Sequence, residues 1–216
     1  MGEDKPILWV GSSLDDLRAF PEDARRIAGF ELRRVQQGLQ PTDWKPMGSV
    51  GAGVEEIRVH TGQEHRVFYI ARFEEGVYVL HAFEKRSRKT PATEIELART
   101  RLREVLAGEA EVTMTHKIKS RVTRATGNVF RDLGFPPDKA EHLLVRADLM
   151  IRLEKELGSR GLKQAQAAKL LGISQPRVSD LLRGRVELFS ADTLIDMLAR
   201  LGIKVRLVAS TRARVA

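Results

Sequence analysis

Basic side chains recur on strand-like segments in the first half of the chain, where they could bind a phosphodiester. Arg58 lies in an alternating segment, 54–60, Arg66 lies in the next apolar segment, and the basic run KRSRK at 85–89 follows a third. Cations gathered on one sheet face could hold a phosphate and stabilise charge that develops during phosphoryl transfer. The alternative is that these side chains form an ordinary solvated strand face.

No metal-binding pattern accompanies these cations. His60, His65 and His81 lack a partner at the i,i+4 spacing of a helical metal site, and the chain has no cysteine. No glycine-rich loop joins a strand to a helix in the way that cradles a phosphate. We therefore expect no metal and no cofactor, and the lack of cysteine fits a reducing cytoplasm.

A second pattern, LKQAQAAKLLGISQPRVSDLLRGR at 162–185, could read DNA. Two short helical segments flank Gly172, and small residues let them cross closely as a helix-turn-helix. The second helix would present its first turns to base edges, with Arg177 suited to guanine and Gln175 to adenine. The remaining candidate DNA contacts are Gln164, Lys169, Ser174, Ser179 and Arg183. The alternative is a helix pair with an exposed polar face.

The charge distribution favours the DNA-binding interpretation of the second half. Residues 1–113 contain 17 Lys and Arg against 19 Asp and Glu, whereas residues 114–216 contain 20 against 10. Only the second half is basic enough to indicate a polyanionic partner by composition. No apolar run approaches the ~18 residues of a membrane span, and acidic residues near the N-terminus argue against a secretory signal, so we expect a cytoplasmic protein without a membrane partner.

The elements that must position the first set of cations form a small α+β domain. The pattern predicts a strand, two helices, a loop at 38–53, three antiparallel strands and a final helix, with the strands at 7–10, 54–60, 65–73 and 77–83 and the final helix from Thr93. The second half reads as all-helical, after a basic arm at 117–124 and before a short strand-like tail at 204–208.

The first half resembles the phage-derived branch of RelE/HigB-type toxins. The resemblance covers roughly residues 5–107 and rests on the ordered blocks DWKPMGSVGAGVEEIRV and EHRVFYIARFEEGVYVLHAFEKRSRKTP, followed by a helix. Toxins of this family are metal-independent ribonucleases that commonly cut mRNA on the ribosome. Their usual chemistry is attack of a ribose 2′-hydroxyl on the adjacent phosphate, helped by Arg and Lys.

The resemblance assigns the catalytic cations to Arg58, Arg66 and Lys85. Arg66 and Lys85 are expected to flank the scissile phosphate, and Arg58 either assists or holds the sheet through Glu55 or Glu56. The RNA-binding residues that it implies are Lys45, Arg86, Arg88 and Lys89. A general base is not evident, because a strand histidine such as His81 is more often structural.

The second half resembles the XRE-type antitoxins that accompany HigB-like toxins. The blocks GNVFRDLGF, the helix-turn-helix and FSADTLIDMLARLGIKVRLV occur in that family's order over residues 117–208. Such antitoxins bind their toxin and, as dimers, repress their own operon. The resemblance therefore implies operator DNA as partner, mutual binding of the two halves and a homodimer formed through the second half.

Together the patterns predict one chain with a toxin domain at 1–107, a linker and basic arm at 108–124, and an antitoxin domain at 125–216. Met114 resembles the initiator of a second protein, so a natural fusion, an engineered fusion and two chains numbered in one run all fit. The expected function is a HigBA-type pair in which the antitoxin silences a latent endoribonuclease until cleavage within 108–124. The alternative is a repressor whose first domain no longer cleaves RNA.

Overall fold

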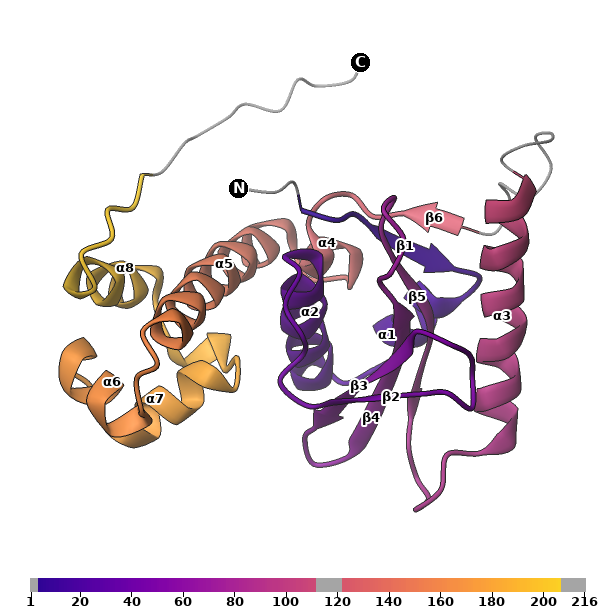
Figure 1. The fold of residues 1–216 in the computed structure, drawn as a ribbon, viewed down its shortest axis with the longest axis horizontal. Helices are drawn as coiled ribbons and strands as arrows, with labels where there is room; N and C mark the ends of the chain where they lie inside the picture. Colours follow the sequence, from indigo (N-terminus) through magenta and orange to yellow (C-terminus); the bar gives the residue numbers. More distant parts are fainter. Residues whose placement is uncertain (1–3, 112–121, 207–216) are drawn as a thin grey trace. The chain divides into compact units, whose positions relative to one another are not determined.

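A computed structural model describes residues 4–111 and 122–206, which form two compact units, Met1–Ala147 and Asp148–Ala216 (Figure 1). Helix α5 (Pro137–Ser159) contributes residues to both units. No helix among the described residues is long and apolar enough to cross a membrane. The expected class is confirmed: an α+β region with a mainly antiparallel sheet precedes an all-helical region.

The sheet of the first unit has six strands in the order β2-β3-β4-β5-β1-β6. The three expected antiparallel strands are β3 (Val54–His60), β4 (Glu64–Ile70) and β5 (Val77–Glu84). β1 (Ile7–Val10) runs parallel to β5, so the sheet is mixed. A further strand, β2 (Trp44–Pro46), pairs with β3 inside the segment that the sequence predicted as a loop. The interval 38–53 is therefore only partly loop.

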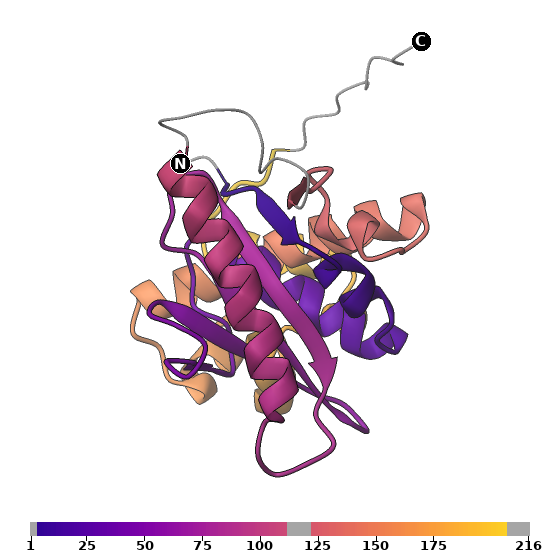
Figure 2. The ribbon, with the colours of Figure 1, turned by 90° about the vertical axis from the view of Figure 1, so that its right-hand side faces the viewer.

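Two helices cover opposite faces of this sheet. Figures 1 and 2 show α2 (Glu22–Gln36), preceded by α1 (Ser13–Arg18), on one side and α3 (Ala92–Glu111) on the other. A hydrophobic cluster fills the space beneath α3 and includes Phe68, Leu80, Phe83, Ala98 and Leu102. Gly51 is required beside it, since a Cβ there would lie 2.2 Å from the Leu102 side chain. Both faces are thus buried except where polar side chains interrupt the core.

Residues 122–147, which we call the docking segment, pack on β1 and α2 of the same unit. β6 (Val122–Arg124) pairs antiparallel with β1, and the Ala125 amide donates to the Ile7 carbonyl at 2.9 Å. Helix α4 (Val129–Asp132) follows and lies against α2. A short stretch that the sequence assigned to the arm and the start of the antitoxin thereby completes the sheet.

Aromatic packing and backbone-directed hydrogen bonds hold α4 against α2. Phe130 is fully buried beside Gly29, where an added Cβ would lie 2.8 Å from the Phe130 ring. Arg18 Nε donates to the Asp132 carbonyl at 2.6 Å, and Arg25 Nη1 donates to the Leu133 carbonyl at 2.8 Å. The Phe130 ring lies close to Gly29, and the carbonyls of Asp132 and Leu133 are hydrogen-bonded. The contact between α4 and α2 is therefore specific and well packed.

The second unit contains α6 (Gln164–Leu171), α7 (Gln175–Leu182), a 3₁₀ turn η1 (Val186–Leu188) and α8 (Ala191–Arg200). Gly172 ends α6 with φ +65°, and Arg200 Nη1 donates to the Leu171 carbonyl at 2.7 Å in the space that a Cβ would fill. Only glycine fits this turn. Of the expected strand-like tail, residues 204–206 belong to no strand, and 207–208 lie outside the described residues.

The burial of Phe130 gives a stability prediction. Phe130→Ala should lower the free energy of unfolding by about 3–5 kcal/mol, because it removes a buried ring and leaves a cavity against α2. Val145→Ala, at a residue of the same segment that is 40% exposed, is the matched control and should change it by less than about 0.5 kcal/mol. Urea unfolding of the full chain would measure both. Equal effects would contradict the packing described.

Candidate nucleic-acid interfaces

Three candidate cations meet around one buried carboxylate on the α3 side of the sheet. Glu56 is fully buried and lies 3.5 Å from Lys45 Nζ, 3.4 Å from Arg58 Nε and 3.6 Å from Arg66 Nε. β3 and β4 bring Arg58 and Arg66 directly opposite each other. Like charges in that register repel, so Glu56 compensates both. The structure thus places Lys45, Arg58 and Arg66 together, with Arg58 on Glu56 rather than Glu55.

The cluster extends into a closed ring of alternating charge. His60 Nε2 lies 2.7 Å from Asp43 Oδ2, and Asp43 Oδ1 lies 3.6 Å from Arg58 Nη1. On the other side, His60 Nδ1 lies 2.8 Å from Glu64 Oε1, whose second oxygen lies 2.8 Å from Arg66 Nη2. The circuit therefore runs His60–Asp43–Arg58–Glu56–Arg66–Glu64 and back to His60.

Exposure divides the ring into a buried base and an open rim. The side chains of Glu56 and Arg66 are 1% and 9% exposed, whereas those of Arg58, Asp43, Glu64 and His60 range from 33% to 51%. The hydrogen bond to Glu64, and then that to Asp43, raise the pKa of His60 above its usual value, although partial burial opposes them. The rim is where a ligand can reach the cluster.

Lys85 lies beside the ring, but its side chain is held within its own loop. The Lys85 amide donates to the Glu64 carbonyl at 2.7 Å, while Nζ donates to the carbonyls of Ser87 and Arg88. Arg86 pairs with Glu84 at 3.1 Å. Arg88 and Lys89 are exposed at the tip. This loop presents a basic surface next to the ring, and its contact with RNA stays a prediction from the resemblance.

Sequence reasoning missed Asp43, Glu64 and the central role of Glu56. The alternation of β3 did place Glu56, Arg58 and His60 on one face, which was the available signal. His81 is 5% exposed, with Nδ1 at 3.0 Å from Asp16 and Nε2 at 2.6 Å from Glu94. It therefore joins α1, β5 and α3 from inside the core. No group of three or more His, Cys, Asp and Glu among the described residues has an arrangement that could hold a metal ion.

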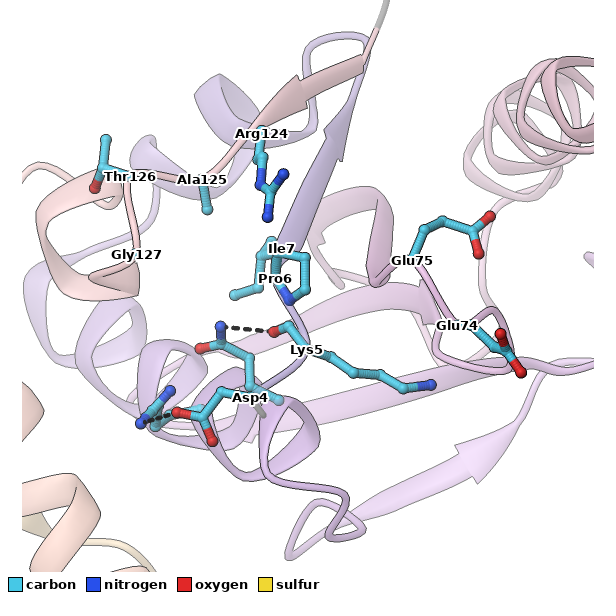
Figure 3. A pocket seen from close by; sticks show the side chains of 12 residues that line it. Asp4, Lys5, Pro6, Ile7, Glu74, Glu75, Arg124, Ala125, Thr126 and Gly127 are labelled. Atoms are coloured by element: carbon cyan, nitrogen blue, oxygen red, sulfur yellow. Dashed lines mark hydrogen bonds and ion pairs between the residues drawn. The ribbon is translucent and has the colours of Figure 1, made fainter. Parts of the chain in front are cut away.

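A cleft of about 530 Å³ lies beside the seam between β1 and the docking segment (Figure 3). Its walls mix acidic and basic side chains, including Asp4, Lys5, Glu74 and Arg124. Lys5 Nζ donates to the carbonyls of Ala71 and Phe73 at 2.8 and 2.7 Å, so this cation is already engaged. The cleft is not lined by any of the candidate catalytic cations.

In the second unit, α6 and α7 display the expected polar side chains, but one of them, Arg177, is bonded to a neighbouring segment. Gln175 is exposed on α7, Arg183 is exposed at the C-cap that follows it, and Ser179 is half-buried. Arg177 instead donates to the Leu188 carbonyl at 2.6 Å, and its guanidinium lies 4.2 Å from the Phe189 ring centre. Arg177 therefore helps to hold η1 against α7.

The remaining DNA candidates occupy the surface around the turn. Gln164 and Lys169 are exposed on α6. Ser174 is the N-cap residue of α7, as expected, but its side chain makes no capping hydrogen bond. Its hydroxyl is therefore not committed to the helix end, where backbone amides suit a phosphate oxygen.

Comparison with known families matches both halves separately. Residues 15–103 match the model of the phage derived protein Gp49-like family, and residues 129–210 match a helix-turn-helix domain model. The chain joins a Gp49-like domain to a helix-turn-helix domain. No curated protein matches the chain. The resemblance to RelE/HigB-type toxins and to XRE-type proteins is confirmed by these matches.

The two matches change how the docking segment is understood. The helix-turn-helix match begins at Val129, so α4 and the first part of α5 belong to that family region yet pack within the unit of the Gp49-like domain. The helix-turn-helix domain supports DNA as a partner of this chain, and the Gp49-like domain supports RNA.

The geometry of α7 gives a DNA-binding prediction. Gln175→Ala should lower discrimination at one base position by ~1–3 kcal/mol, because it removes a contact to a base edge. Arg177→Ala should do the same and also lower the melting temperature, since it frees the Leu188 carbonyl. Lys169→Ala should weaken all sequences alike and flatten the salt dependence.

Binding titrations against a set of DNA sequence variants at several salt concentrations would measure these effects. Arg152→Ala, on α5 outside the two helices, is the control that should leave affinity unchanged. A loss of sequence discrimination in Lys169→Ala equal to that in Gln175→Ala would contradict the assignment.

Proposed function

We propose that the protein is a type II toxin–antitoxin pair in one chain: a HigB-like, metal-independent mRNA endonuclease held silent by its own HigA-like domain, which binds operator DNA as a dimer and represses its operon in the cytoplasm. The observation that carries this proposal is the docking segment. Sequence assigned to an antitoxin packs on toxin-like elements through β6 and Phe130, as a neutralising partner would.

The proposed chemistry uses the two arginines of the ring and the lysine beside it. Arg58 is the more exposed arginine and would contact the scissile phosphate together with Lys85, once Lys85 leaves the carbonyls of its loop. Arg66, which is almost fully buried between Glu56 and Glu64, would fix the position of Arg58 and add positive potential. Lys45, Arg86, Arg88 and Lys89 would bind neighbouring phosphates. Attack of the 2′-hydroxyl would then yield a cyclic phosphate and a 5′-hydroxyl.

Neutralisation would act at a distance from these cations. The strand order places β6 at the edge next to β1, whereas the ring lies on β3 and β4, with β5 and β1 between them. The docking segment therefore adds bulk to the far edge instead of covering the ring. We propose that this bulk prevents the domain from reaching ribosome-bound mRNA, and that tethering keeps the inhibitor at roughly millimolar effective concentration.

A repressor with a non-cleaving first domain is the second candidate, and one observation favours it. Every cation of the ring already has a carboxylate partner, so the site at rest carries little excess positive charge. A domain kept only for protein contacts or RNA binding would tolerate that arrangement, whereas a ribonuclease must exchange some of these partners for phosphate.

Growth arrest separates the candidates. Induction of residues 1–113 alone should stop growth and fragment labelled mRNA, and the full chain should do neither, because only the fragment lacks the docking segment. Arg66→Ala and Lys85→Ala in the fragment should lower cleavage by at least about 10²-fold, as loss of transition-state charge stabilisation does. Arg103→Ala, at a residue 69% exposed on α3, is the control.

The outcomes have distinct meanings. A folded fragment without toxicity identifies the chain as a repressor, and RNA binding without cut products identifies a binding module. Unchanged toxicity in Arg66→Ala and Lys85→Ala would contradict the catalytic assignment.

A second prediction concerns the covalent connection. If a protease site is placed within 112–121 and cut, the two pieces should remain together, because β6, Phe130 and the Arg18 and Arg25 hydrogen bonds do not depend on the peptide link. A cut alone should therefore leave the chain silent, contrary to the expectation from sequence.

Phe130→Asp should separate the cut pieces, because an unpaired charge would be buried against Gly29. Val145→Asp is the matched exposed control. Gel filtration after cleavage measures both, and separation of the unmodified pieces would show that the contacts are too weak for neutralisation in cis.

A further inference from the structure

The ring contains a histidine that none of the expected roles uses. Residues 56, 58 and 60 of β3 share one face, and His60 is the outermost of them, with half of its side chain exposed. At about 3.4 Å per residue, His60 and Arg58 are separated by roughly 7 Å along the strand. The side-chain tips come closer than that, because one oxygen of Asp43 lies 3.6 Å from Arg58 Nη1 and the other lies 2.7 Å from His60 Nε2. Both tips can therefore contact one phosphodiester, with Arg58 at a phosphate oxygen and His60 at the ester oxygen.

The two carboxylates that contact His60 determine which protonation state of its imidazole is favoured. Asp43 and Glu64 each accept a hydrogen bond from one ring nitrogen, and both carboxylates favour the protonated imidazolium. The other charged groups facing it are Arg58 and Arg66, and each is paired with one of these carboxylates. An imidazolium stabilised in this way is prepared to donate a proton rather than to accept one.

The geometry points to His60 as the general acid of the proposed RNA cleavage, which makes this assignment dependent on the proposed function. Glu64 keeps Nδ1 oriented, and the 5′-oxygen of the scissile phosphodiester takes the place of Asp43 at Nε2. The 2′-oxygen forms a bond to phosphorus and its proton passes to water. The bond from phosphorus to the 5′-oxygen breaks, and that oxygen receives the proton of His60.

This role explains why the ring is closed at its exposed rim. Asp43 retains Arg58 after it leaves His60, so no carboxylate is left without a cation when substrate enters. Glu64 likewise holds both His60 and Arg66, which fixes the acid relative to the buried arginine. The ring is therefore a positioning device, and His60 is its catalytic member.

The intact chain is used for the test, and within its first unit the docking segment lies at the opposite edge of the sheet from the ring. Two RNA oligonucleotides are compared, one with the natural 5′-oxygen at the scissile bond and one with sulfur there. A thiolate leaves without protonation, so it does not need a general acid. His60→Gln should slow cleavage of the oxygen substrate by about 10²–10⁴-fold and that of the sulfur substrate by less than about tenfold.

Two further readouts accompany the rates. The wild-type rate on the oxygen substrate should fall as pH rises through the pKa of His60, and His60→Gln should lose this fall. The imidazole of His60, followed by NMR in the full chain, should titrate above about 6.5 and should titrate lower in Glu64→Gln. His142→Gln, at an exposed histidine on α5, is the control that should change neither rate.

Each outcome decides a separate question. Equal loss on both substrates, an unaffected His60→Gln enzyme, or a His60 that titrates at or below the ordinary value overturns the general-acid assignment while RNA cleavage stands. A wild-type chain and a 1–113 fragment that both fail to cleave either oligonucleotide remove the proposed ribonuclease, and the role of His60 with it.

Discussion

The burial of one carboxylate, Glu56, organises the candidate RNA site. A charge removed from water costs several kcal/mol unless partners surround it, and Lys45, Arg58 and Arg66 supply that compensation from three adjacent strands. Two arginines in direct cross-strand register are tolerable only with an anion beside them. The positions of the candidate cations therefore follow from a stability requirement before any substrate is considered.

The same unit solves a second problem, which is the open edge of β1. An edge strand presents unpaired amides and carbonyls. Here β6 pairs with β1, and Asn128 caps α4 by accepting hydrogen bonds from the Phe130 and Arg131 amides at 3.0 and 3.3 Å. The cap fixes the start of the helix that carries Phe130 to Gly29. The N-cap at Asn128 thus helps to position the contact between two sequence regions that match different families.

The sequence predicted the elements whose patterns are regular and missed contacts between distant residues. The segments predicted at 54–60 and 77–83 match β3 and β5 almost to the residue, and alternation in the first put Glu56, Arg58 and His60 on one face. β2 was not predicted because the interval 38–53 contains four glycines and two prolines, one of which, Pro46, is the last residue of the strand. Asp43 and Glu64 reach His60 only through the β2–β3 and β3–β4 pairings, and no local pattern encodes such a closure. Arg177 was predicted to read guanine, and its hydrogen bond to the Leu188 carbonyl is a further contact that the sequence did not indicate.

The strand order has a consequence for how the chain is made. The first domain emerges from the ribosome with β1 exposed at one side, and the strand that covers it, β6, is translated only after α3. Until then β1 is an unpaired edge strand, which can form backbone hydrogen bonds with a strand of another molecule. The later segment therefore protects the earlier one while it folds, and a chain that ends before β6 should aggregate more readily.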